Sequence, residues 1–91
     1  MMYKKKPGNK EIESTGKWDT WEKEPSEFPW SYDQKETCYI LEGQATVSDN
    51  EGNEMSFGKG DWVVFEEGLE CIWKISRKIK KRNRRLSKAH R

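Results

Sequence analysis

Six side chains in strand-like stretches of the sequence could bind a ligand or take part in chemistry: Trp30, Tyr32, Glu36, Cys38, Cys71 and Trp73. Within each stretch they lie two or four residues apart, and side chains at this spacing share one face of a β-strand. Aromatic walls around a few polar groups are typical of a small-molecule pocket. We therefore predict that these six side chains face a common interior and form a ligand-binding site.

Catalysis by this group would depend on Glu36 or on a thiol. Glu36 is its one carboxylate and could act as an acid or a base. A cysteine nucleophile needs a neighbouring base, and the single histidine of the chain, His90, lies far away in the basic end. The sequence therefore favours a non-enzymatic protein, with Glu36 as the catalytic candidate if the chain is an enzyme.

Metal binding is disfavoured by the same shortage of histidine. Iron, manganese, nickel and zinc sites use several imidazole or thiolate ligands, whereas the donors here are Glu36, Cys71 and Cys38. We therefore expect no metal and no other cofactor. Two cysteines are also too few for a secreted disulfide framework, which favours a reduced, cytoplasmic protein. A disulfide between them stays open.

The elements that position these side chains are short strands separated by turns. Strand-like runs cover residues 28–32, 37–41, 44–48, 55–57, 62–65 and 70–75, with one more short strand near Ile79. Glycine-containing turns separate several of them, and a hairpin loop is expected over 49–53. This pattern predicts an all-β sandwich or barrel. With 5 Trp, 3 Tyr and 3 Phe but few aliphatic residues, its core must contain many rings.

The two ends of the chain lie outside the strand pattern. Residues 1–16 are polar without an apolar period and predict a flexible N-terminal segment, followed by a barrel over 17–83. Residues 84–91 predict a basic tail that is a frayed helix or coil. No apolar run suits a signal peptide, and none approaches the roughly 20 residues of a membrane span. We expect no membrane partner.

Positive charge is concentrated in the C-terminal part. Residues 74–91 contain ten Lys or Arg and no acid, whereas residues 1–73 contain eight Lys or Arg and all 16 acids. Such runs are usually a solvated face. The segment 77–91 could also bind nucleic acid weakly and non-specifically through phosphate contacts, as an accessory protein would.

Two stretches resemble the motifs of the cupin family. In Glu36-Thr-Cys-Tyr-Ile-Leu-Glu-Gly43, six residues separate the glutamate from the glycine, as in the first motif. In Gly60-Asp-Trp-Val-Val-Phe-Glu-Glu-Gly68, the glycines have the spacing of the second motif. The chain is most similar to uncharacterised one-domain cupins of the branch that includes (S)-ureidoglycine aminohydrolase and ethanolamine-utilisation cupins. The resemblance covers about residues 18–83 and implies a single cupin (RmlC-like jelly-roll) β-barrel.

The resemblance also implies what the interior lacks. Metal-binding cupins use three histidines and a glutamate, and the matching positions here are Trp30, Tyr32, Cys71 and Glu36. Since Glu36 alone keeps the residue type of a ligand, the resemblance implies a metal-free barrel. Three possibilities stay open: a structural module filled by rings, an open barrel that binds a small organic molecule, and an enzyme of ureidoglycine aminohydrolase or isomerase type acting on a small polar nitrogen compound.

The outer wall carries an apolar patch of its own. Tyr39, Leu41 and Ile72 alternate with the interior residues and therefore face outward. Either the N-terminal segment, with Trp18 or Trp21, covers this patch, or a second copy of the chain does. Cupins commonly pair through such sheets, so the resemblance implies a homodimer.

Overall fold

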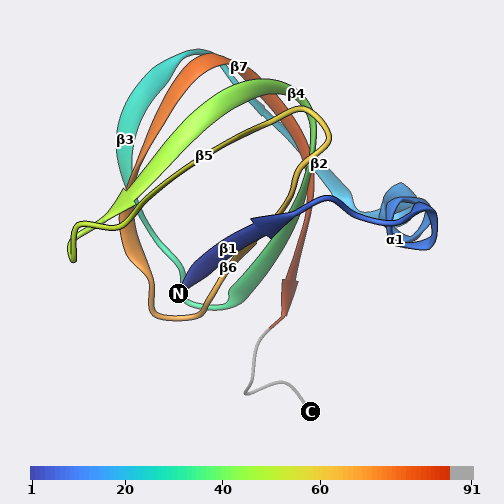
Figure 1. Cartoon of the computed structure of the whole chain (residues 1–91), viewed down its shortest axis with the longest axis horizontal. Helices are drawn as coiled ribbons and strands as arrows, with labels where there is room; N and C mark the ends of the chain where they lie inside the picture. Colours follow the sequence, from blue (N-terminus) through green and yellow to red (C-terminus); the bar gives the residue numbers. More distant parts are fainter. Residues whose placement is uncertain (87–91) are drawn as a thin grey trace.

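The chain forms an antiparallel β-sheet that curls around a packed interior (Figure 1). The structure, a computed structural model, describes residues 1–86. Its strands are β1 (Met2–Lys5), β2 (Asp19–Lys23), β3 (Ser26–Ser31), β4 (Lys35–Asp49), β5 (Glu54–Gly58), β6 (Trp62–Phe65) and β7 (Glu70–Leu86). A short helix, α1 (Asn9–Ser14), and a 3-10 turn, Thr15–Lys17, connect β1 to β2. The predicted all-β cupin architecture is confirmed. Among residues 1–86, no helix has the length and apolar character required to cross a membrane.

The two longest strands, β4 and β7, form the frame of the barrel. They pair with each other from Lys35 opposite Leu86 to Asp49 opposite Cys71. The other edge of β4 pairs with β6 and then with β5, and the other edge of β7 pairs with β2 and then with β3. Each long strand therefore belongs to two parts of the sheet, so it bends around the interior (Figure 1).

The bend in β4 is located at Gly43. The register between β4 and β7 shifts several times between Ile40 and Ala45, as at a β-bulge. Gly43 has a φ of 98°, and a Cβ added to it would lie 2.0 Å from the carbonyl oxygen of Lys78. Glycine is therefore required here both by the conformation and by the close approach of β7. The sequence predicted two strands separated by a bend, whereas the structure has one strand bent at the same place.

Aromatic rings packed around Trp73 form one part of the core, beside aliphatic side chains such as Ile40, Val63 and Ile79. The Trp73 ring centroid lies 5.4 Å from that of Phe57, 5.6 Å from Phe65, 6.1 Å from Trp21 and 6.2 Å from Phe28. These separations are typical of favourable aromatic pairs, each of which adds about 0.5–1.5 kcal/mol beyond its buried area. The prediction of a ring-rich core is confirmed.

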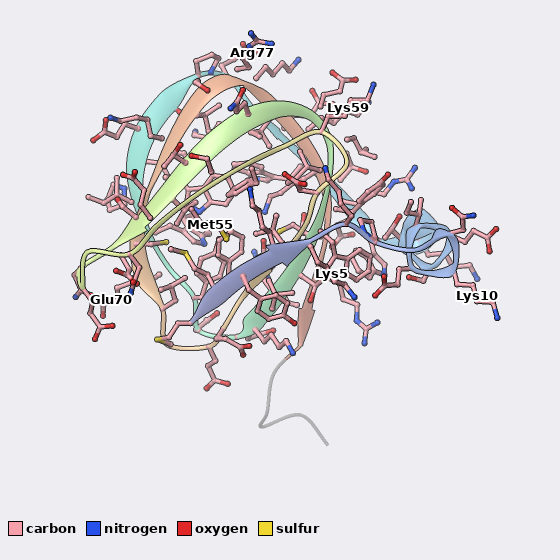
Figure 2. The ribbon with its side chains drawn as sticks, viewed as in Figure 1. Lys5, Lys10, Met55, Lys59, Glu70 and Arg77 are labelled. Carbon is pink, nitrogen blue, oxygen red and sulfur yellow. The ribbon has the colours of Figure 1, made fainter. Side chains whose placement is uncertain are left out.

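Side chains alternate between the interior and the surface along β4 and β7. Figure 2 shows side chains filling the space between the strands, while Lys10, Lys59, Glu70 and Arg77 lie at the periphery. In β7, Cys71, Trp73 and Ile75 are buried, whereas Ile72 and Lys74 between them are exposed. The predicted division of faces is therefore correct in this strand.

Residues 1–16, which the sequence predicts to be a flexible segment, contain a strand and a short helix in the structure. Strand β1 pairs with β6, which gives its main chain hydrogen-bond partners at an otherwise open sheet edge. The Glu11 carboxylate accepts a hydrogen bond from the Gly8 N–H at 2.9 Å, at the start of α1. Arg82 then donates to the buried Thr15 hydroxyl at 3.0 Å. These attachments are made by polar groups, so no apolar periodicity in the sequence indicated them.

The predicted boundary between barrel and tail at residue 84 is wrong, because the last strand extends beyond it. Strand β7 continues to Leu86, and Thr37, Glu36 and Lys35 of β4 lie opposite its last three residues. A frayed helix or coil is therefore excluded for residues 84–86, and residues 87–91 lie outside the described part of the chain. The last short strand predicted near Ile79 is the middle of this same β7.

The N-terminal segment covers part of the outer wall. The Trp18 ring lies 5.4 Å from that of Trp62, and the Arg84 guanidinium carbon lies 6.0 Å from the Trp18 ring centroid. Tyr39, which is opposite Trp62 in the sheet, and Leu41 are half-buried, whereas Ile72 is exposed. Of the two tryptophans considered for this role, Trp18 lies outside, and Trp21 packs on the interior Trp73.

Replacing Gly43 by alanine should destabilise the barrel more than replacing Gly52. Both glycines have a positive φ, 98° and 88°, so both variants carry the backbone cost of about 1–2 kcal/mol. A Cβ at Gly43 also meets the backbone of Lys78, whereas a Cβ at Gly52 has nothing within 4 Å. Urea denaturation of Gly43→Ala and Gly52→Ala measures the difference. Equal losses of unfolding free energy would contradict the assigned close approach.

Candidate functional site

A small cavity lies inside the barrel, between β2, β3, β4 and β7. Its volume is about 60 Å³, enough for a few water molecules, and we call it the inner cavity. Five rings and four polar side chains line it: Trp21, Phe28, Trp30, Tyr32, Trp73, Glu36, Lys81, Asn83 and Arg85.

A larger hollow adjoins the inner cavity. This outer depression measures about 340 Å³ and shares Trp30, Tyr32, Glu36 and Arg85 with the cavity. Asp33 and Gln34 also line it. Since the same four side chains border both spaces, the outer depression is a natural entrance to the inner cavity.

A buried ion pair between Glu36 and Lys81 forms the polar centre of the cavity. The Lys81 ammonium donates to the Glu36 Oε2 atom at 2.7 Å and to the Cys38 sulfur at 3.3 Å. The Cys38 thiol in turn donates to Glu36 Oε2 at 3.2 Å. Both charged side chains are only 6% exposed. A buried charge is tolerated only when it is paired and hydrogen-bonded, as it is here.

Two indole rings complete the surroundings of the ammonium. The Lys81 Nζ atom lies 4.9 Å from the Trp21 ring centroid and 5.3 Å from that of Trp73. Ring faces attract cations, and this attraction is stronger when water is excluded. Burial acts to lower the pKa of Lys81, but the electrostatic effects of Cys38 and Glu36 and their hydrogen bonds outweigh it and raise the pKa above its ordinary value. Lys81 is therefore an ammonium ion at neutral pH.

The second oxygen of Glu36 faces a different neighbour. Oε1 lies 3.6 Å from Arg85 Nε, which is longer than a hydrogen bond, and the Arg85 side chain is 58% exposed. Among residues 1–86, Oε1 accepts no hydrogen bond. It is thus an acceptor at the wall of the inner cavity that remains available to a ligand.

Tyr32 is bound to a neighbouring ring rather than to Glu36. Its hydroxyl accepts a hydrogen bond from the Trp73 indole N–H at 3.1 Å. Burial raises the pKa of Tyr32 far above its ordinary value, and Cys38 and Glu36 act in the same direction. The tyrosine therefore remains a neutral phenol.

Four of the six predicted site residues lie together on the cavity wall: Trp30, Tyr32, Glu36 and Trp73. Cys38 is fully buried behind Glu36. Cys71 lines a separate hollow of about 250 Å³ that also touches Trp30, and its thiol approaches the Trp30 carbonyl oxygen at 3.5 Å. Both cysteines are free thiols, so they form no disulfide with each other.

Sequence reasoning missed five residues of the wall: Trp21, Phe28, Lys81, Asn83 and Arg85. Lys81 and Arg85 were counted with the basic run of the C-terminal part. The signal that could have found them is the odd-numbered alternation of β7, since Ile79, Lys81, Asn83 and Arg85 continue the inward face of Trp73 beyond the bulge.

The donor set of the cavity does not fit a metal ion. The positions that match histidine ligands in metal-binding cupins hold Trp30, Tyr32 and Cys71, and the remaining position, Glu36, already pairs with Lys81. Nowhere in residues 1–86 do three His, Cys, Asp or Glu side chains gather closely enough to hold an ion. The positive charge beside Glu36 is therefore supplied by the protein itself.

Replacing Lys81 by methionine should lower the unfolding free energy by about 3–5 kcal/mol, because the buried Glu36 would lose its close partner and keep only the long ion pair with Arg85. The matched control is Lys78→Met, which removes an exposed pair with Glu22 at 3.2 Å and should cost at most about 1 kcal/mol. The double variant Lys81→Met with Glu36→Gln should recover part of the loss. Urea denaturation measures all three, and equal losses for Lys81→Met and Lys78→Met would refute the assignment.

Stability should decrease above pH 9. Burial raises the pKa of Cys38 from 9.0 to about 12, so the thiol ionises in the unfolded chain while it stays protonated in the barrel. The unfolded state then binds fewer protons, and the unfolding free energy falls by up to about 1.4 kcal/mol per pH unit between pH 9 and 12. The raised pKa of Lys81 also makes the unfolding free energy fall as the pH rises above 10.5. Denaturation from pH 7 to 10.5 should show a shallower decline for Cys38→Ala, and an unchanged slope would count against this account.

Comparison with known proteins places the chain in a family. The model of the EutQ-like cupin domain matches residues 11–82. A DUF861 family protein of known structure from Thermotoga maritima is 41% identical, with a TM-score of 0.92 over 94% of this chain and 100% of that chain. No curated protein matches the sequence.

Two more distant structures share the fold alone. A putative ethanolamine utilization protein Q from Salmonella typhimurium is 20% identical, with a TM-score of 0.66 over 72% of this chain and 53% of that chain. The EutQ protein of Clostridium difficile is 14% identical, with a TM-score of 0.69 over 78% of this chain and 56% of that chain. With a family model that spans most of its length and a relative that it covers completely, the chain belongs to the EutQ-like cupin domain family.

Proposed function

We propose that this protein binds a small organic molecule in the inner cavity and the outer depression. The observation that carries the proposal is the wall itself, in which five aromatic rings surround a neutralised ion pair and the unused Oε1 atom of Glu36. Apolar walls with a few convergent polar groups are the usual composition of small-molecule sites.

Trp30 has the position of an entrance residue. Its ring belongs to both spaces and is 45% exposed, although large rings are usually well buried. It also meets the Phe28 ring edge-on, with a centroid separation of 6.4 Å. A planar or apolar part of the ligand would pack against these rings, and an N–H or O–H group would donate to Glu36.

The polar groups support binding better than catalysis. Lys81 and Cys38 hold the Oε2 atom of Glu36 in place, which leaves Oε1 as the atom that can contact a ligand. Burial raises the pKa of Cys38 to about 12 and that of Cys71 to about 11, so both thiols are protonated at neutral pH and are poor nucleophiles. We therefore favour binding over a ureidoglycine-type reaction.

Several cations of the C-terminal part have partners within the protein. Lys81 pairs with Glu36, Lys78 with Glu22 at 3.2 Å, and Arg82 with Thr15. This favours a structural use of β7 over an arm for nucleic acid. The predicted homodimer stays a proposal, with the exposed Ile72 as the part of the outer patch that a second copy would cover.

A titration with ring compounds tests the binding function. We expect benzamide, benzoate or benzylamine to shift the indole N–H signals of the protein in nitrogen-correlated NMR spectra. Trp30→Ala should weaken that binding about three- to tenfold through the loss of ring packing. The control is Tyr3→Ala, which removes a ring of similar exposure, 48%, on β1 and should have no effect. If no probe binds, or if Trp30→Ala changes nothing, the proposal fails.

A further inference from the structure

We propose that the ligand is a small organic carboxylate, held at its anionic end by Arg85 while its apolar part packs between the rings of the cavity wall. This inference rests on the binding function proposed above and adds the chemical class of the ligand. Three observations carry it: the exposed position of Arg85, the neutralisation of Glu36 by Lys81 and the charge around the entrance.

Arg85 is a cation at the boundary of the two spaces, and its ion pair with Glu36 is long and partly open to solvent. It lines both the inner cavity and the outer depression, and its nearest carboxylate atom, Glu36 Oε1, lies 3.6 Å away. Its side chain is more than half exposed, so approaching solutes reach it. The planar guanidinium can donate two parallel hydrogen bonds to a carboxylate, which a lysine ammonium cannot do.

Glu36 would repel a carboxylate ligand if its charge were not compensated. Lys81 provides this compensation at 2.7 Å from Oε2, inside a wall of rings where charges are poorly screened by water. The pair is neutral as a whole, so the charge of Arg85 remains available to a ligand. In this arrangement Lys81 is a positioning and neutralising residue, while Arg85 makes the contact.

Further cations surround the entrance on the side of Arg85. A further hollow, of about 460 Å³, shares Asn83 and Arg85 with the inner cavity and is also lined by Lys17, Asp19 and Arg84. When Asp33 of the outer depression and the pair of Lys81 and Glu36 are included, four cations face three carboxylates around the entrance. Residues 1–73 carry twice as many acids as bases, so this is a positive region on an acidic body. Such a field attracts anions and favours a carboxylate over an ammonium compound.

Three probes with the same ring and different charge test the inference: benzoate, benzamide and benzylamine. By the NMR titration described above, benzoate should bind most tightly, and Arg85→Gln should weaken benzoate at least about tenfold, because a charge-assisted hydrogen bond is lost. Arg85→Lys should retain only part of the affinity for benzoate, because lysine keeps the positive charge but lacks the two parallel N–H donors of the guanidinium. The matched control is Arg77→Gln in the same strand, where the side chain is exposed at the periphery and touches none of the three hollows (Figure 2).

The outcomes separate this inference from the binding function. Preferred binding of benzoate that depends on Arg85 and not on Arg77 supports both. If benzamide or benzylamine binds as tightly as benzoate or more tightly, and this binding depends on Trp30, the inference of a carboxylate ligand is refuted. The proposed binding function of the pocket is then retained. Equal losses for benzoate and benzamide in Arg85→Gln would show a steric role for Arg85 and also overturn the inference. If no probe binds in a Trp30-dependent way, both proposals fail.

Discussion

The ion pair between Glu36 and Lys81 sets the conditions for everything else in the interior. Two charges removed from water cost several kcal/mol each, and their attraction repays this cost only if the geometry is good and other hydrogen bonds are made. Here the Cys38 thiol and the rings of Trp21 and Trp73 complete the surroundings of the pair. The pair also joins the two longest strands, because Lys81 of β7 lies opposite Ile40 of β4 and its side chain reaches Glu36 on the same strand.

The same pair explains how this cupin interior can do without histidine ligands. By resemblance, Glu36 matches the position of a metal ligand in metal-binding cupins. The neighbouring cation here is the ammonium of Lys81 on the adjacent strand. A lysine delivers one positive charge at a fixed place, but it offers no open coordination positions for a substrate. This arrangement supports the proposed binding of a molecule by charge and ring contacts.

Much of the fold could be predicted from the sequence, because strand alternation and glycine turns are local signals. The faces of β7 around Trp73, the hairpin after β4 and the ring-rich core follow from spacing alone. The N-terminal attachment could not be predicted, since Thr15 and Glu11 bind through polar atoms that look like solvated residues in a sequence. Lys81 and Arg85 were missed for a related reason: a charged side chain on an inward position is indistinguishable from its neighbours in a basic run until the opposite strand is known.

The pairing of β7 with three other strands has a consequence for how the chain reaches its native state. Met2 of β1 lies opposite Phe65, and Asp19 of β2 lies opposite Asn83, so the first two strands pair with residues about 60 positions later in the sequence. Proteins dominated by such distant contacts fold slowly, in milliseconds to seconds, since long loops must close before the contacts can stabilise the chain. During synthesis on the ribosome, the barrel would have to wait for its last strand, with the aromatic residues of β2 to β6 exposed to chaperones until then.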